Sequence, residues 1–277
     1  MIRLGLLGER IAYSRSPALH QAAFVAAGLA GSYELVPCPP ESATATIAAC
    51  RAAGFRGLNV TVPHKQRALA QCDALRPAAA QTGAVNTLVF APDGTTTGDN
   101  TDVAGFLAGL PTELELSGRT ALVLGAGGAA RAVVAALRTT PLGRIVVTAR
   151  RLEQAQSLGA EAVPWTESAL APLCPALVVN ATPAGTNAER SSSRWSEACA
   201  LFGALPFGSW DRPFAYDLVY VPAITPFLAI AVAAGCPTQG GRAMLVHQAV
   251  LAFEAFTGVP ASMVVGAMDR AFAESLP

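Results

Sequence analysis

Short apolar runs alternate with alanine-rich stretches along residues 1–104. Such alternation is typical of strands in a parallel sheet that is covered by helices. Strands are predicted at 4–8, 33–36, 57–62 and 88–90, and helices at 17–27, 42–53, 65–72 and 77–82. Pro17 follows Ser16, an order of residues that is common at the start of a helix. This part of the chain is therefore predicted to be an α/β unit.

Continuous apolar runs return after residue 119 and favour fully buried strands. Strands are predicted at 121–124, 144–148, 177–180 and 215–218, and later helices at 225–234 and 245–257. Helical stretches separate these strands, as they do in a doubly wound sheet. The stretch 187–213 is rich in Ser, Gly and Pro and is predicted to be a loop. A second α/β domain is therefore expected.

Composition excludes several classes of protein. Apolar residues make up 52% of the 277 positions and charged residues 14%, which excludes a disordered chain. The 19 basic and 19 acidic residues cancel, so no long-range field attracts nucleic acid or an anionic membrane. The six cysteines form no Cys-x-x-Cys pair and have no companion histidines at metal-ligand spacing, so reduced thiols and no metal centre are expected.

The location and the oligomeric state follow less directly. No apolar stretch reaches the length of about 18 residues that spans a bilayer. The N-terminal region meets Glu9 and Arg10 at once, which leaves no apolar segment long enough for a secretory signal. A cytoplasmic protein is therefore expected. A monomer and a homodimer are both compatible with the sequence, because no exposed apolar face can be identified from it.

Three polar clusters interrupt or flank the apolar runs of the first domain. They supply amide, hydroxyl and charged side chains at Asn59, Thr61, Lys65, Asn86 and Asp102. Buried polar groups need hydrogen-bonding partners, and a polar ligand would supply them. The clusters therefore predict one binding pocket for a molecule that is rich in hydroxyl groups.

A glycine-rich turn follows the strand predicted at 121–124 and opens a helix with the sequence Gly125-Ala126-Gly127-Gly128-Ala129. Glycines let the backbone approach a pyrophosphate, whose charge is stabilised by free N–H groups and by the positive end of the helix dipole. A strand-to-helix turn can also need glycine for steric reasons alone. The flanking strand and helix favour a dinucleotide site over this alternative.

Arg150 and Arg151 follow the strand predicted at 144–148, where enzymes that use NAD usually carry Asp or Glu for the ribose hydroxyls. A guanidinium binds phosphate through two parallel hydrogen bonds, so this position favours NADP. A solvated arginine pair is the alternative.

The segment 180–185, Asn-Ala-Thr-Pro-Ala-Gly, ends another strand at the same edge. We assign it to the nicotinamide side, although an ordinary Pro/Gly turn explains it nearly as well.

Together these motifs resemble those of the shikimate dehydrogenase family along almost the whole chain. The matching segments, in the family's order, are 14–17 with His20, 59–65, 83–87, 98–102, 125–129, 180–183, Tyr216 and Asp217 with Tyr220, 225–228, and 244–245 with Gln248. The resemblance implies a substrate domain made of 1–104 and 241–277 and a Rossmann-type NADP-binding domain at 105–240, with a central cleft.

The resemblance also implies an activity, which is the reversible NADPH-dependent reduction of 3-dehydroshikimate to shikimate in aromatic amino acid and chorismate biosynthesis. Lys65 and Asp102 match the family's catalytic pair. Implied substrate contacts, including those to the carboxylate, are Ser14, Ser16, Asn59, Thr61, Asn86, Tyr216 and Gln248. Implied cofactor contacts are Gly125, Ala126, Gly127, Gly128, Ala129, Arg150, Arg151, Asn180, Thr182, Pro183, Leu218 and Gly241.

Alternatives remain for both the residues and the activity. Considered alone, Lys65 fits a solvated lysine at a helix start, and Asp102 fits the N-cap of the next helix. A relative that acts on quinate or other hydroxy acids is the nearest rival. Another rival is a non-catalytic NADP-binding regulator, which would be expected to have lost Lys65 or Asp102. Both residues are present.

Two segments depart from the family's usual residues. Many members carry Asn-Arg-Thr where this chain has Ala149-Arg150-Arg151, which keeps the central arginine. Near the C-terminus the common Asp-Gly-Leu-Gly-Met-Leu is replaced by Gly-Gly-Arg-Ala-Met-Leu at 240–245. The first departure leaves the strength of the NADP preference open, and the second puts the backbone contact to the nicotinamide in doubt.

Overall fold

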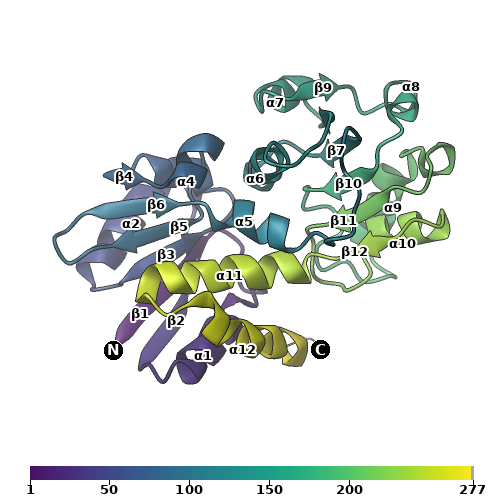
Figure 1. The fold of residues 1–277 in the computed structure, drawn as a ribbon. Coiled ribbons are helices and arrows are strands. Elements are labelled where there is room, and N and C mark those ends of the chain that lie inside the picture. The colour runs from purple at the N-terminus through teal and green to yellow at the C-terminus, as the bar shows by residue number, and fades with distance from the viewer. Residues whose placement is uncertain (276–277) are drawn as a thin grey trace. The chain divides into compact units, whose positions relative to one another are not determined.

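The computed structural model describes residues 1–275, which form two α/β units (Figure 1). The first unit comprises Met1–Ala108 and the segment from Leu245 onward, and the second comprises Gly109–Met244. The sequence placed the division near residues 104 and 240. Because helix α5 (Thr101–Ala108) belongs entirely to the first unit, its whole length is available to position side chains there.

The sheet of the first unit has the strand order β2-β1-β3-β5-β6-β4. Its strands are β1 (Ile2–Gly8), β2 (Gly31–Pro37), β3 (Gly57–Val60), β4 (Ala74–Leu75), β5 (Thr87–Phe90) and β6 (Thr96–Asp99). Strands β2, β1 and β3 are parallel, as the alternating apolar runs predicted. The strands predicted near 4–8, 33–36, 57–62 and 88–90 all lie in this sheet, whereas β4 and β6 were not predicted.

The prediction of a wholly parallel first sheet is wrong, because β5 is antiparallel to both β3 and β6. A tight turn joins β5 to β6. In it, Asp93 Oδ1 accepts a hydrogen bond from Thr95 N at 2.9 Å, and Gly94 has a φ of 89°. Pro92-Asp93-Gly94 is a typical turn sequence, and a connection this short can only join antiparallel strands.

Helices cover the first sheet and bury its aromatic core. They are α1 (Ser16–Ala26), α2 (Ala43–Ala52), α3 (Lys65–Leu69), α4 (Pro77–Thr82), α5, α11 (Arg242–Thr257) and α12 (Ala261–Glu274), with the 3₁₀ turn η1 at Pro40–Ser42. Helix α12 lies beside α1 (Figure 1). The rings of Phe24 and Phe253 meet edge to face, with centroids 5.1 Å apart. This packing joins the C-terminal helices α11 and α12 to the N-terminal helix α1.

The sheet of the second unit is parallel throughout its described strands and has the order β12-β11-β10-β7-β8-β9. Its strands are β7 (Thr120–Leu124), β8 (Arg144–Thr148), β9 (Glu161–Val163), β10 (Leu177–Asn180), β11 (Phe214–Asp217) and β12 (Thr238–Gln239). From β7 the chain continues to β8 and β9 on one side, and it then returns to form β10, β11 and β12 on the other side. The strand order therefore reverses between β7 and β10. The doubly wound sheet predicted from the sequence is therefore confirmed, and ligands of such sheets bind where the carboxyl ends of the strands meet this switch point.

Residues 187–213 were predicted to be a loop, and this prediction is wrong. The segment contains helix α9 (Ser193–Gly203) and the 3₁₀ turn η3 (Phe207–Ser209). Ser192 caps α9 by accepting a hydrogen bond from Trp195 N, and Ala198 and Phe202 are buried four positions apart on one face. The serine-rich sequence, which favours a loop, contains an N-cap serine followed by an amphipathic helix.

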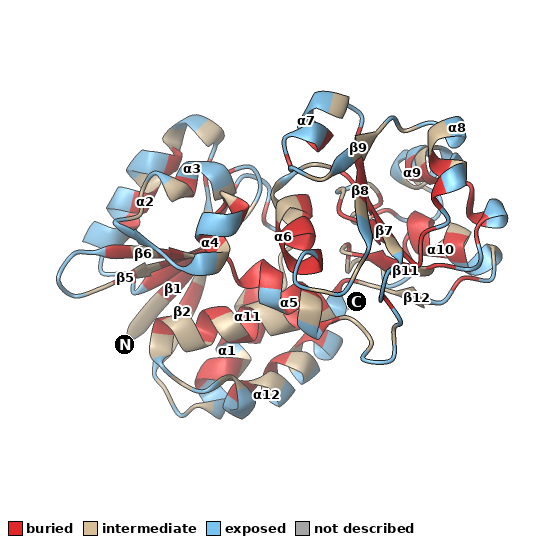
Figure 2. Cartoon of the chain, turned by 45° about the horizontal axis from the view of Figure 1, so that its top comes forward, coloured by how far each residue is buried: buried red, intermediate tan, exposed pale blue. Residues whose placement is uncertain are grey.

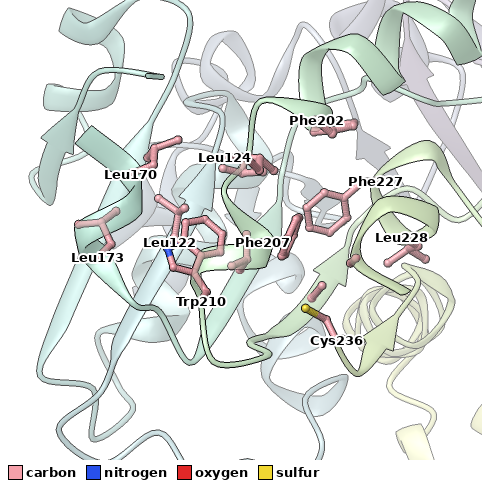
Figure 3. Packing of buried hydrophobic residues seen from close by; sticks show 14 of the residues in the cluster. Leu122, Leu124, Leu170, Leu173, Phe202, Phe207, Trp210, Phe227, Leu228 and Cys236 are labelled. Carbon is pink, nitrogen blue, oxygen red and sulfur yellow. The ribbon is translucent and has the colours of Figure 1, made fainter. Parts of the chain in front are cut away.

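The remaining helices of the second unit are α6 (Gly128–Leu137), α7 (Leu152–Gln156), α8 (Glu167–Leu170) and α10 (Pro226–Ala233), with the 3₁₀ turn η2 at Ala171–Leu173. Figure 3 shows the aromatic cluster between the sheet and α9 and α10, where Phe202, Phe207 and Phe227 pack against one another. Figure 2 shows that residues of β7, β10 and β11 are mostly buried. Within residues 1–275, no helix is both long and apolar enough to span a bilayer.

Candidate active site and cofactor site

Lys65 and Asp102 form an ion pair in the first unit. Lys65 is the first residue of α3, and its Nζ donates a hydrogen bond to Oδ2 of Asp102 in the first turn of α5. The two side chains are only 13% and 8% exposed. Lys65 is therefore not the solvated lysine that its position at a helix start allowed.

Asn86 holds the other oxygen of the Asp102 carboxylate. Its Nδ2 donates to Asp102 Oδ1 at 2.9 Å and to Thr101 Oγ1 at 3.0 Å, and its Oδ1 accepts from Thr101 N at 2.8 Å. The backbone N–H of Asp102 is bonded to Oδ1 of Asn100. Asn100 thus supplies the side-chain cap at the start of α5, and the Asp102 carboxylate faces the lysine instead.

Asn59 is occupied by the protein itself. Its Oδ1 accepts from Tyr33 OH at 2.9 Å, and its Nδ2 donates to Thr87 Oγ1 at 3.2 Å and to the backbone oxygen of Asn86 at 3.3 Å. The expectation that strand-end polar groups need a ligand does not hold for Asn59, because Tyr33 of β2, Thr87 of β5 and the backbone of Asn86 satisfy its amide. Asn59 therefore supports Asn86 and Thr87 through its hydrogen bonds.

Further predicted substrate residues lie on other elements of this unit. Ser14 and Ser16 stand at the N-terminus of α1, with their hydroxyl oxygens 3.2 Å apart. Thr61 follows β3, and its backbone N–H is bonded to Leu7 at 2.9 Å. Gln248 lies on α11 and donates to the carbonyl of Leu245 at 2.8 Å. A Cβ at Gly105 of α5 would lie 2.8 Å from the Gln248 Cβ, so this glycine lets the two backbones approach closely.

The two histidines near the site are structural. His64 is buried and its Nε2 lies 2.8 Å from the carbonyl oxygen of Cys38. His20 is buried, and its ring stacks on Tyr33 with centroids 4.1 Å apart. Burial lowers the pKa of His20 to about 3, so its ring is neutral at physiological pH.

Tyr216 lies in the second unit, at β11. Its side chain is fully buried, and this burial raises its pKa to about 12. The phenol therefore stays protonated and can donate. Its contact with a substrate carboxylate remains a prediction.

The glycine-rich turn has the geometry of a phosphate cradle. Strand β7 ends at Leu124 and α6 begins at Gly128. Gly125 between them has a φ of 105°, a backbone conformation that residues other than glycine rarely adopt. A Cβ at Gly125 would lie 3.0 Å from Thr182 Cγ2, which brings two predicted cofactor segments together. A Cβ at Gly127 would meet no described atom within 4 Å. The space before the N-terminus of α6 is thus open to a ligand, as a dinucleotide requires.

A cavity of about 480 Å³ opens beside Arg150. Its lining also includes Leu152, Trp165 and Leu201. Arg150 and Arg151 are both exposed, so either guanidinium can turn toward a phosphate. Arg151 has the N-cap position of α7, whereas Arg150 lines the cavity, which distinguishes two neighbours that the sequence left equivalent.

Comparisons with known proteins match this chain over nearly its full length. Residues 6–88 match the shikimate dehydrogenase substrate binding domain, and residues 241–271 match the shikimate 5'-dehydrogenase C-terminal domain. The chain is 39% identical to an NADP-dependent shikimate dehydrogenase of Methylobacterium radiotolerans, over 98% of this chain and 97% of that one. The chain belongs to the shikimate dehydrogenase family.

Solved structures of related proteins share its fold. The shikimate 5-dehydrogenase of Thermus thermophilus in complex with NADP(H) and shikimate is 39% identical, with a TM-score of 0.83 over 100% of both chains. Quinate dehydrogenase of Corynebacterium glutamicum in complex with NAD is 33% identical, with a TM-score of 0.81 over 99% of both chains. The fold is therefore shared by enzymes with different substrates and cofactors, and the residues of the site have to separate them.

Asp217 of this shikimate dehydrogenase family member has a structural role that was not predicted from its motif. It ends β11, and its carboxylate accepts hydrogen bonds from Asn180 Nδ2 at 2.8 Å, Val219 N at 3.0 Å and Thr225 Oγ1 at 2.5 Å. Asn180 in turn accepts from the backbone and hydroxyl of Thr182. Asp217 thus ties together the carboxyl-end loops of β10 and β11. An aspartate at the end of an apolar strand was the signal in the sequence.

We expect the stability of the second unit to fall between about pH 4 and about pH 7. Burial raises the pKa of Asp217 from 3.8 to about 7, although three hydrogen bonds favour its ionised form. The native state then binds more protons than the unfolded state in this window, so the free energy of unfolding decreases as the pH rises, by up to a few kcal/mol. Urea unfolding of wild type and Asp217→Asn at about pH 5 and about pH 8 measures this; an unchanged pH dependence in the variant would contradict it.

Proposed function

We propose that this protein reversibly reduces 3-dehydroshikimate to shikimate with NADPH. The observation that carries the proposal is the buried Lys65–Asp102 pair, held by Asn86, in a member of the shikimate dehydrogenase family. A non-catalytic NADP-binding regulator has no need for a buried lysine paired with a carboxylate. Burial of such a charged pair costs free energy. In an enzyme the pair can stabilise the negative charge that develops on a carbonyl oxygen as the carbonyl is reduced to an alcohol.

The chemistry of the pair follows from charge and proton balance. NADPH, when bound, supplies the hydride that reduces the carbonyl carbon. The carbonyl oxygen becomes negative as the hydride arrives, and the Lys65 ammonium stabilises that charge and delivers a proton to it. Asp102 orients the ammonium through Oδ2, while Asn86 fixes the carboxylate through Oδ1. In the reverse direction the pair removes the hydroxyl proton as the hydride leaves.

Neutral donors are proposed to bind the carboxylate of the substrate. Ser14 and Ser16 offer two hydroxyl groups at the positive end of α1, a helix of 11 residues. Thr61, Asn86 and Gln248 are proposed to bind the ring hydroxyls and the carbonyl. Asn59 is assigned to the support of Asn86, because its own amide atoms are occupied.

NADP is proposed to lie along the carboxyl edge of the second sheet. The turn Gly125–Ala129 and the N-terminal N–H groups of α6 would hold the pyrophosphate, and Arg150 beside its cavity would hold the 2′-phosphate. The segments at Asn180–Pro183, Leu218 and Gly241 are proposed to line the nicotinamide side. Arg151 is assigned a supporting charge near the 2′-phosphate.

Arg150→Ala is expected to lower the preference for NADP over NAD by about 10-fold to 100-fold, because charge-assisted hydrogen bonds to phosphate are worth about 1.5–3 kcal/mol. The ratio of kcat/KM for the two cofactors measures this preference. Arg151→Ala is expected to change this ratio less than Arg150→Ala does, since Arg151 belongs to the same exposed segment but lies outside the cavity lining. An unchanged ratio in Arg150→Ala would remove its proposed role.

The activity is tested by following formation of the reduced cofactor during oxidation of shikimate and of quinate, each with NADP and with NAD. Turnover confined to shikimate with NADP is the expected result. Efficient turnover of quinate or use of NAD would favour the broader relative, and turnover with none of the four pairs would favour a regulator.

A cytoplasmic location and a monomer or homodimer are part of the proposal; sedimentation distinguishes the two oligomeric states.

A further inference from the structure

A chain of hydrogen bonds leads away from the catalytic pair into the protein. The Asp102 carboxylate can only accept, so Asn86 must turn its Nδ2 toward it, at 2.9 Å. The Oδ1 of Asn86 then faces the other way, where it accepts from Thr87 Oγ1 at 2.9 Å. The orientation of the Asn86 amide is therefore set from both sides.

The same reasoning fixes the next two links. The hydroxyl of Thr87 has one hydrogen, which it donates to Asn86, so toward Asn59 it can only accept. Asn59 Nδ2 donates to it at 3.2 Å, which turns Asn59 Oδ1 toward Tyr33 OH at 2.9 Å. Each member of the chain thus has one permitted donor direction, and the charge of Asp102 determines it as far as Tyr33.

Tyr33 is the last member of this chain, at Asn59. Burial raises the pKa of Tyr33 well above its ordinary range, so the phenol keeps its proton and donates it to Asn59. The neutral, buried ring of His20 stacks on Tyr33 at an interplanar angle of 11° and holds it in place.

We propose that Tyr33 is a positioning residue for the reaction proposed above. Through Asn59 and Thr87 it helps to hold the Asn86 amide that fixes Asp102 and hence Lys65. Without its hydroxyl, the buried Oδ1 of Asn59 loses its donor, so Asn59 and the Thr87 hydroxyl bonded to it are expected to shift and to hold the Asn86 amide less firmly. The inference rests on the proposed function, since it assigns Tyr33 a part in that site.

The test compares Tyr33→Phe, Thr87→Val and the double variant in the full-length protein. Tyr33→Phe removes only the hydroxyl, and Thr87→Val breaks the chain at a later link while keeping the side-chain volume. We expect kcat to fall by about 10-fold to 100-fold in each single variant, because displacement of a catalytic group by about 1 Å can cost about 10² in rate. The double variant is expected to be about as slow as either single variant, since one break already releases the chain.

A matched control separates positioning from loss of stability. Ile47→Val, in the buried cluster of α2, is expected to cost about 0.5–1.5 kcal/mol of stability and to keep wild-type kcat. Rates are compared at temperatures where thermal unfolding shows each variant to be folded, and Thr87→Val carries the test if Tyr33→Phe does not fold. Wild-type kcat in both single variants, or multiplied losses in the double variant, would overturn the inference. An inactive wild-type protein would instead overturn the proposed function.

Discussion

Replacement of Lys65 by alanine is expected to lower kcat for shikimate oxidation by about 10²–10⁴-fold, the range typical of a positioned acid–base group. Lys65 brings an ammonium to a site where it is 13% exposed and where Asp102 holds it. In that surrounding the charge acts on the substrate oxygen more strongly than it would in water. Spectrophotometric turnover with NADP measures the loss.

Controls for this result come from the same helix and from the ion pair itself. Arg67 is an exposed cation two positions further along α3, so Arg67→Ala is expected to keep wild-type turnover. Because Lys65→Ala leaves the Asp102 carboxylate without its cation, stability can fall by about 3–5 kcal/mol, and folding is checked by denaturant unfolding. Partial rescue by added methylammonium would support the proton-donor role. Turnover within a few-fold of wild type in a folded Lys65→Ala would contradict it.

Gly241→Ala is expected to lower kcat/KM for NADP by about 10²-fold. A Cβ at this position would lie 2.1 Å from the carbonyl oxygen of Leu218 and 2.6 Å from its carbonyl carbon. Backbone cannot move aside as a side chain can, so the loop after β11 and the start of α11 would have to separate. The hydrogen bond from Gly241 N to Val219 O, at 3.1 Å, would be lost with this separation. Leu218 and Gly241 are both proposed cofactor contacts.

The neighbouring Gly240 is the control. A Cβ there would meet its nearest atom at 3.6 Å, which is ordinary van der Waals contact. Gly240→Ala is therefore expected to keep kcat/KM for NADP within about 2-fold of wild type, because no backbone displacement is required. Steady-state turnover of the folded variants at varied NADP concentration checks both expectations. Equal effects of the two substitutions would show that the contact at Leu218 does not determine cofactor binding.

The sequence determined most of the element order because local signals were strong. Helix α4 and strands β8 and β10 have the predicted bounds, since proline, glycine and apolar runs mark their ends. Helix α9 was missed because serine suits both a loop and a helix cap. Strands β4 and β12 have two residues each, too few for any pattern.

The candidate site divides in the same way. Motifs selected Lys65 and Asp102, which are 37 positions apart, but only the folded chain brings the ammonium to the carboxylate. Motifs also selected Asn59 as a substrate contact, whereas Tyr33 of β2 and Thr87 of β5 form hydrogen bonds with its amide. A side chain's free donors and acceptors depend on what surrounds it, and its own sequence segment does not record that.

The sequence by itself determined the family, the two α/β sheets and the residue types of the site, because hydrophobic periodicity and short motifs are local properties of the chain. The tertiary structure decided which polar groups remain free for a ligand, the antiparallel course of β5 and β6, and the difference between Gly240 and Gly241. Those outcomes depend on hydrogen-bond partners and van der Waals distances between segments remote in sequence, which exist only after the strands and helices have packed.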